Sequence, residues 1–289
     1  MNKEDNMKAA LYPNFQKANA LECARKTCDV LDAAGIEVYV SGDFRNDFAD
    51  KPFVHFEDIS ESAKNADFVL AIGGDGTILR CAKYLIGSDT KLLGINTGTL
   101  GFLASLEADQ LDNLFRLKSG DYEISERMTL DVIFSGEEGE VRYTALNEIA
   151  ARSGSFRICD FDVYADGYLT GKYRADGVLF STPSGSTAYA LSAGGPVIEP
   201  DLECIEMTLI CPHSLFSRAT MFSPGRRLTI TDKTRGGSMV ITVDGDLERK
   251  LGENESVEIC RGRHNVKFVS LIGNSFHESL CRKLCRPIK

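Results

Sequence analysis

The spacing of apolar residues changes partway along the chain, and this change divides the sequence into two parts of different fold class. Between Lys8 and about Leu117, short apolar runs alternate with segments of helical spacing, such as Leu21, Ala24 and Cys28. Alternation of this kind predicts an amino-terminal α/β domain with a mostly parallel, doubly wound sheet. The predicted strands are residues 9–12, 36–40, 67–72 and 92–96.

Beyond Tyr122 the helical spacing largely disappears, and strands separated by turn residues follow as far as about Leu271. Asp166-Gly167 is one such turn signal. This pattern predicts a β-rich, sandwich-like domain. Phe276, Leu280 and Leu284 share one helical face, so we expect a carboxyl-terminal helix that returns to the first domain. The expected divisions are residues 1–120, 121–271 and 272–289.

Length and charge limit the classes of partner. A chain of 289 residues is long enough for about two domains, each with its own core. Its 33 basic and 42 acidic residues give a net charge of −9, which argues against nucleic acid or a membrane surface as a partner. Nine cysteines without CxxC spacing, and a polar amino terminus instead of a signal peptide, favour reduced thiols and a cytoplasmic location.

The glycine-rich turn after residues 67–72 is the first candidate site. Gly73-Gly74-Asp75-Gly76-Thr77 follows a buried strand and precedes a helical segment. Glycine lets backbone N–H groups converge on a phosphate, and the start of a helix favours an anion. Asp75 would repel a phosphate, so its carboxylate is expected to handle a proton, a hydroxyl or a metal ion. The alternative is that Asp75 only caps the helix.

Two shorter motifs are weaker on their own. Asn96 to Phe102 forms a second glycine-bearing turn after residues 92–96, and it is either an ordinary loop or the other wall of the same crevice. Asn147-Glu148 offers an amide that can pair with an adenine edge and a carboxylate that can accept ribose hydroxyls or hold a metal ion. A solvated turn is the alternative for this pair.

Residues 174–196 form the richest stretch. A predicted strand, Val178 to Ser181, leads into a turn of small hydroxyl residues, and Tyr189 follows to stack on a base or hydrogen-bond to it. A Ser/Gly linker is the alternative, but apolar segments flank the turn on both sides. Neither a Walker A loop nor a GxGxxG motif is present, and the zinc-like motif that begins at His277 ends in Cys281 instead of histidine.

In this order, these motifs resemble those of the NAD kinase family from about Lys8 to Leu284. The block from Asp176 to Pro196 is the most specific of them, whereas the Gly-Gly-Asp-Gly motif alone is shared with diacylglycerol and sphingosine kinases. Ala175 stands where the family commonly has glycine, and Asp246 stands where it often has glutamine. The second departure leaves the role of the turn at Asp244-Gly245 open.

The resemblance implies that the terminal phosphoryl group of ATP, or of another phosphoryl donor, is transferred to the 2′-hydroxyl of the adenosine ribose of NAD, which gives NADP. It also implies that Mg²⁺ or another divalent cation takes part. It implies a homodimer or homotetramer, with Asp75 as the catalytic base and with no residue assigned to the metal. Asp176 is expected toward the nicotinamide end, often from a neighbouring subunit. Phosphate contacts are expected from Gly73, Gly74, Gly76 and Thr77. NAD contacts are expected from Gly74, Asp75, Gly76, Phe102, Asn147, Glu148, Arg174, Asp176, Ser184, Thr187, Ala188 and Tyr189.

Two other functions fit part of the pattern. A lipid kinase has the same glycine turn, but the turn after its next strand typically resembles Pro-x-Gly-Thr-Gly-Asn, which differs from the Asn96-Thr97-Gly98 turn here. A nucleotide-binding module without catalysis is the other alternative. The presence of Asp75, Asn147 and Glu148 argues against it.

Overall fold

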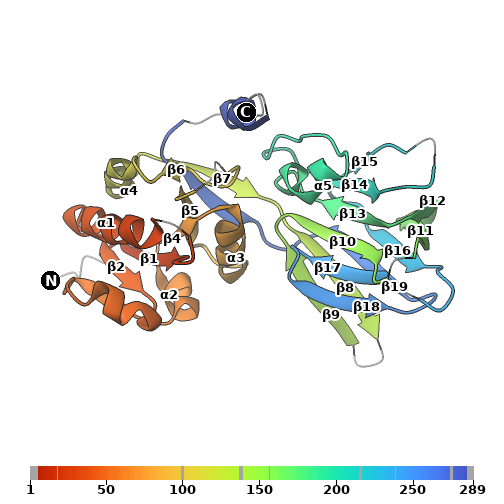
Figure 1. The fold of residues 1–289 in the computed structure, drawn as a ribbon, viewed down its shortest axis with the longest axis horizontal. Coiled ribbons are helices and arrows are strands. Elements are labelled where there is room, and N and C mark those ends of the chain that lie inside the picture. The colour runs from red at the N-terminus through yellow and green to blue at the C-terminus, as the bar shows by residue number, and fades with distance from the viewer. Residues whose placement is uncertain are drawn as a thin grey trace. The chain divides into compact units, whose positions relative to one another are not determined.

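The computed structural model describes residues 6–17, 19–98, 101–136, 139–155, 157–214, 217–237, 239–273 and 276–284. The chain forms two compact units (Figure 1). The first contains the residues up to Glu126 together with those from Val266 onward, and the second runs from Arg127 to Asn265. Within the described residues, no helix is both long and apolar enough to span a membrane.

The first unit is built on a sheet in the order β3-β2-β1-β4-β5-β20-β7, with β6 paired to β5. The pairs from β3 to β20 are parallel. The strands are β1 (Lys8–Pro13), β2 (Glu37–Val40), β3 (Val54–Phe56), β4 (Phe68–Gly73), β5 (Lys91–Asn96), β6 (Leu106–Glu107), β7 (Glu123–Arg127) and β20 (Val266–Ser270). The helices are α1 (Ala20–Ala33), α2 (Ile59–Asn65), α3 (Asp75–Leu85), α4 (Phe115–Ser119) and α6 (Phe276–Leu284), with 3-10 turns η1 (Gly42–Phe48) and η2 (Leu111–Leu114).

Burial explains why these strands are continuous apolar runs. Every residue of β4 is buried, so both faces of the sheet must be covered. On one face, α1 contributes Cys23, Cys28 and Leu31 to the core. The helix ends at Ala33, and Gly35 shortly after it has a φ of 69°, which glycine adopts without strain.

The strand order reverses between β1 and β4, since β2 and β3 lie beyond β1 whereas β5 lies beyond β4. In open α/β sheets, ligands bind outside the carboxyl ends of the strands at such a switch point. Asn14 follows β1 and its N–H donates to the Ile72 carbonyl at the end of β4 (2.9 Å). The turn that begins at Gly73 therefore lies at the switch point.

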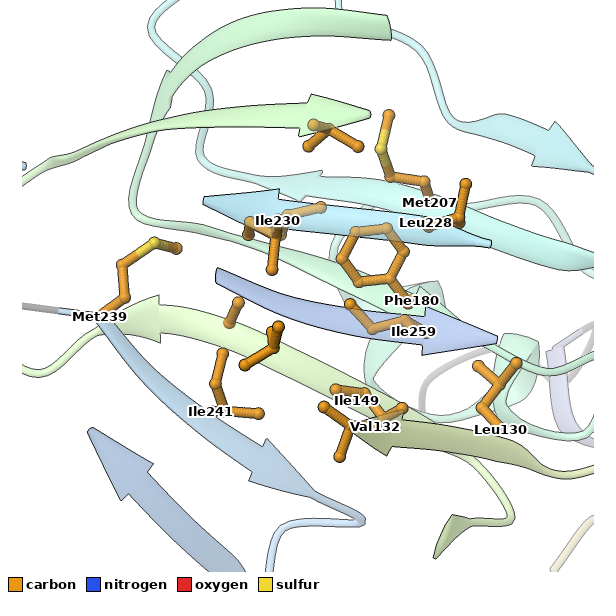
Figure 2. Close-up of a cluster of buried hydrophobic side chains, with 14 of the residues drawn as sticks. Leu130, Val132, Ile149, Phe180, Met207, Leu228, Ile230, Met239, Ile241 and Ile259 are labelled. Atoms are coloured by element: carbon orange, nitrogen blue, oxygen red, sulfur yellow. The ribbon is translucent and has the colours of Figure 1, made fainter. Parts of the chain in front are cut away.

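The second unit is a sandwich of two antiparallel sheets, ordered β15-β14-β13-β10-β17-β18 and β12-β11-β16-β19-β8-β9. Figure 2 shows side chains such as Ile149 and Phe180 from the first sheet and Val132 and Ile259 from the second in one core. The elements are β8 (Leu130–Gly136), β9 (Gly139–Ala145), β10 (Glu148–Ser153), β11 (Cys159–Ala165), β12 (Tyr168–Ala175), β13 (Gly177–Ser181), η3 (Gly185–Thr187), α5 (Tyr189–Ser192), β14 (Ile205–Ile210), β15 (Thr220–Phe222), β16 (Leu228–Asp232), β17 (Met239–Val243), β18 (Leu247–Leu251) and β19 (Ser256–Arg261).

The predicted fold class is confirmed, with differences in detail. β3 and α2 were not among the predicted elements, and the helical segment expected after the glycine turn begins within that turn, at Asp75. Residues 266–270 were assigned to the β-rich region, but β20 pairs with β5 in the first sheet. The side chain of Leu284, expected on the apolar face of α6, and residues 99 and 100 of the second glycine turn lie outside the described residues.

Candidate functional site

The turn after β4 is shaped by a close approach between Gly73 and Thr77. A Cβ atom at Gly73 would lie 2.4 Å from the Thr77 Oγ1 atom, so the turn requires glycine there. Thr77 is buried, and its hydroxyl accepts a hydrogen bond from the Asn14 Nδ2 group (3.2 Å). The Thr97 N–H donates to the Gly73 carbonyl (3.1 Å). The loops after β1, β4 and β5 therefore meet at this turn.

The Asp75 carboxylate is held by the neighbouring turn and does not cap its own helix. The N-cap of α3 is Gly74, and no side chain caps this end. The Asp75 carboxylate instead accepts the Phe102 N–H (2.8 Å) and the Leu103 N–H (3.2 Å). A Cβ at Gly101 would lie 1.9 Å from Asp75 Oδ1, so this contact also requires glycine. The side chain remains 35% exposed, which leaves it accessible to a ligand.

Gly74 and Gly76 border open space. Gly74 is partly exposed and Gly76 is exposed, and a Cβ at either position would meet nothing within 4 Å. The first N–H groups of a helix lack partners within the helix and carry the positive end of its dipole. The turn therefore combines a fixed carboxylate with backbone groups suited to phosphate.

In the second unit, Asp244 organises the start of β10. Its carboxylate accepts the N–H groups of Leu146 (2.9 Å), Asn147 (2.8 Å) and Glu148 (3.1 Å). Asp244 itself has a φ of 48°, in a turn between β17 and β18. These bonds fix the backbone that presents the side chains of Asn147 and Glu148. Asp244 lies in the turn whose role the sequence left open.

Asn147 and Glu148 each carry a buried polar atom without a hydrogen-bond partner: Asn147 Oδ1 and Glu148 Oε2. Burial raises the pKa of the Glu148 carboxyl to about 7, and the nearby Asp244 carboxylate acts in the same direction, while the Tyr189 backbone N–H acts against them. Buried polar groups are nearly always paired in folded proteins, so these oxygens are suited to a polar ligand.

The loop from Ser184 to Tyr189 packs against this pair. A Cβ at Gly185 would lie 2.1 Å from the Asn147 carbonyl oxygen, so only glycine permits the approach. The Thr182 N–H donates to the same oxygen (2.9 Å). Ser184 is buried, Thr187 and Ala188 are partly exposed, and Tyr189 is 40% exposed. The structure thus brings the predicted adenosine-contacting residues together.

Arg174 and Asp176 lie elsewhere in the second unit. Arg174 on β12 is exposed and forms a bidentate ion pair with Asp160 (2.7 and 2.8 Å). Asp176 is exposed and precedes Gly177 at the start of β13, whereas Glu148 pairs with Ser181 at its other end. The two ends of β13 are four residue steps apart, which is roughly 13 Å in a strand. Within one chain, Asp176 is therefore distant from Glu148.

Two features were not found from the sequence. Gly185 gave no signal of its close approach to Asn147, because only the three-dimensional fold brings β10 against this loop. Lys283 in α6 gave none either, although its ammonium lies 3.6 Å from Asp75 Oδ2.

Comparison with known proteins agrees with this description. Residues 10–118 match the ATP-NAD kinase N-terminal domain, and residues 146–271 match the ATP-NAD kinase C-terminal domain. An NAD kinase of Lachnoclostridium phytofermentans is 34% identical over 285 residues, covering 96% of this chain and 98% of the relative. An NAD kinase of Natranaerobius thermophilus is 34% identical over 279 residues, which cover 95% of this chain and 96% of the relative.

Solved structures show the same fold. The yeast NADH kinase complexed with NADH superposes with a TM-score of 0.89 at 22% identity, covering 99% of this chain and 91% of that one. An Archaeoglobus fulgidus NAD kinase in complex with ATP superposes with a TM-score of 0.72 at 25% identity, covering 91% and 93%. The motifs, the architecture and both domain matches agree, and the chain belongs to the NAD kinase family.

Proposed function

We propose that this chain is an NAD kinase, which transfers the terminal phosphoryl group of ATP to the 2′-hydroxyl of the adenosine ribose of NAD and so makes NADP. One observation carries the proposal beyond family membership. The Asp75 carboxylate lies within the glycine turn at the switch point of the sheet, and two backbone N–H groups of the next turn hold it away from its own helix.

Asp75 serves as the general base in this proposal. A ribose hydroxyl has a pKa far above neutral, so a carboxylate cannot hold a free alkoxide, but it can orient the hydroxyl and take its proton as the bond to phosphorus forms. The O2′–P bond forms, the bond from phosphorus to the ADP oxygen breaks, and the proton passes to Asp75. The open backbone groups of Gly74 and Gly76 hold phosphates in this proposal. The Thr77 N–H, which was also expected to contact phosphate, donates to the Gly74 carbonyl (2.8 Å), so Thr77 and Gly73 shape the turn behind these groups.

The adenosine part of NAD would lie against Asn147 and Glu148. Their unpartnered oxygens can accept hydrogen bonds from the adenine amino group and the ribose hydroxyls. Ser184, Thr187, Ala188 and Tyr189 border them, and the exposed Tyr189 ring can stack on a base. In this proposal Phe102 contacts NAD near the 2′-hydroxyl, beside Asp75. Asp176, preceded by the basic Arg174, contacts NAD toward its nicotinamide end.

A divalent cation, Mg²⁺ by preference, would neutralise charge on the ATP phosphates. Mg²⁺ is commonly held by one or two carboxylates together with substrate phosphates and water. Among the described residues, no group of three or more His, Cys, Asp or Glu side chains is placed to hold a metal ion. That fits a cation that arrives with ATP, and Asp75 is the carboxylate best placed to meet it.

The setting proposed for this activity is a homodimer or homotetramer in the cytoplasm. The eight described cysteines are all free, as expected for a reducing compartment. The net charge of −9 disfavours binding to nucleic acid or to anionic membranes.

The Asp75→Asn variant tests the proposal. It removes the charge and the basicity while keeping the size of the side chain, so we expect kcat to fall by about 10²–10⁴-fold with NAD affinity within a few-fold of the parent. Turnover with ATP and Mg²⁺ is measured for NAD and for a diacylglycerol acceptor, together with the melting temperature. Asp112→Asn, at an exposed position in η2, is the control.

Turnover of the Asp75→Asn variant within ten-fold of its parent would refute the catalytic assignment. Phosphorylation of the lipid in place of NAD would instead support the lipid kinase, and a parent that binds both nucleotides without turnover would support the binding module.

A further inference from the structure

Lys283 brings a cation to the glycine turn from the far end of the sequence. It lies in the last turn of α6, the carboxyl-terminal helix in Figure 1. Its Nζ atom is 3.6 Å from Asp75 Oδ2 and 3.8 Å from the centroid of the Phe102 ring. The side chain is 22% exposed, so the ammonium is partly shielded and remains accessible.

The contact between Lys283 and Asp75 is longer than a strong ion pair. Charge-assisted hydrogen bonds have lengths of about 2.7–2.9 Å, and this separation is 3.6 Å. The carboxylate is already fixed by the N–H groups of Phe102 and Leu103. An ammonium has three N–H donors, and a ring face is a weak partner for a cation. Lys283 therefore retains the capacity to bind another anion.

The anion that comes within reach of Lys283 follows from the geometry of the reaction, so this step rests on the proposed function. A general base lies about 2.6–3.2 Å from the hydroxyl that it deprotonates. That hydroxyl oxygen lies about 3–3.5 Å from the phosphorus that it attacks. The transferred phosphoryl group is thus close to Asp75, on the side open to ligand, where the flexible Lys283 stem also reaches.

We propose that Lys283 binds the terminal phosphoryl group of the donor. The carboxylate of Asp75 repels this group, in a chain whose net charge is −9, so a cation at this point offsets the repulsion. The ammonium leaves Asp75 for the phosphoryl oxygens when ATP binds and opposes their charge as the O2′–P bond forms.

Three variants test this assignment. Lys283→Gln removes the charge, Lys283→Arg keeps it, and Arg282→Gln removes an exposed charge from the same turn of α6 as the matched control. Calorimetric titration measures the affinity of each for ATP and for ADP with Mg²⁺, and steady-state kinetics measures KM for ATP and for NAD. The melting temperature reports the docking of the helix.

For Lys283→Gln we expect ATP affinity and kcat/KM for ATP to fall about 10–100-fold, with ADP affinity and KM for NAD within about three-fold of the parent. Lys283→Arg should recover most of the loss, and Arg282→Gln should match the parent. Equal losses for ATP and ADP, or a lower melting temperature with parental ATP affinity, would overturn the assignment in favour of a structural role.

The binding measurements keep this inference separate from the proposed function. A parent chain that fails to phosphorylate NAD would refute the function. The preference of Lys283 for ATP over ADP would still be decided by the titrations, since they need no turnover.

Discussion

Among single residues, Asn147 and Glu148 each lower the stability of the folded state. Each has a buried oxygen without a hydrogen-bond partner, and such a group costs about 1–3 kcal/mol. The Asp244 carboxylate accepts the backbone N–H groups of both residues and so fixes the backbone from which these side chains extend. A ligand that supplies the missing donors would recover this cost, which is why we propose that this pair binds a ligand.

The same burial predicts a pH dependence of stability. Since the pKa of Glu148 rises from 4.5 to about 7 on folding, its charge destabilises the folded state above pH 7 and has no effect below about pH 4.5, where it is protonated in both states. The shift corresponds to roughly 3 kcal/mol at most. The free energy of unfolding of Glu148→Gln, measured relative to that of the parent, should therefore increase from pH 5 to pH 8.

Urea unfolding at the two pH values measures this gain, with the exposed Glu140→Gln variant as the control. A difference between Glu148→Gln and its parent that is the same at pH 5 and pH 8 would contradict the expectation.

At the scale of elements, the turns after β4 and β5 function as one unit, joined by Asp75 and Gly101. Gly101→Ala places a Cβ where Asp75 Oδ1 lies, so the carboxylate must move from its backbone donors. Because the displaced atoms end a side chain, we expect turnover to fall at least ten-fold while the melting temperature changes by only a few degrees. Gly98→Ala, which meets nothing within 4 Å, is the control from the same turn.

Steady-state kinetics and thermal unfolding of both glycine variants measure the turnover and the melting temperature. Parental turnover in Gly101→Ala would show that the position of the Asp75 carboxylate does not limit the reaction.

An element could be predicted from the sequence only where its own residues form a recognisable hydrophobic pattern. The continuous apolar run of β4 and the helical spacing of apolar residues in α1 were sufficient to predict a strand and a helix. The three residues of β3 and the seven of α2 are too short for a periodic signal. Glycine turns marked the position of Asp75, but its partners Phe102 and Lys283 depend on tertiary contacts that no local pattern encodes.

At the scale of the whole molecule, the first unit is completed by residues from both ends of the chain. β20 joins the parallel sheet beside β5, and α6 brings Lys283 to Asp75. In the sequence, residues 127–265 lie between these segments, and they form the sandwich of the second unit. Residues 266–271 were expected in the sandwich, because a strand at the end of a β-rich stretch carries no local signal for the sheet that it joins.

The position of Asp176 leads to a prediction about assembly. Asp176 lies at the opposite end of β13 from the Glu148 position, so an Asp176 near an NAD molecule held by Asn147 and Glu148 is expected to come from a neighbouring subunit. We therefore expect Asp75→Asn and Asp176→Ala subunits, each of low activity alone, to form hybrids that contain one intact site and regain activity. The mixture is assayed for NADP formation after exchange between differently tagged subunits, which native mass spectrometry verifies. Exchanged hybrids as inactive as their parents would show that Asp176 acts within its own subunit.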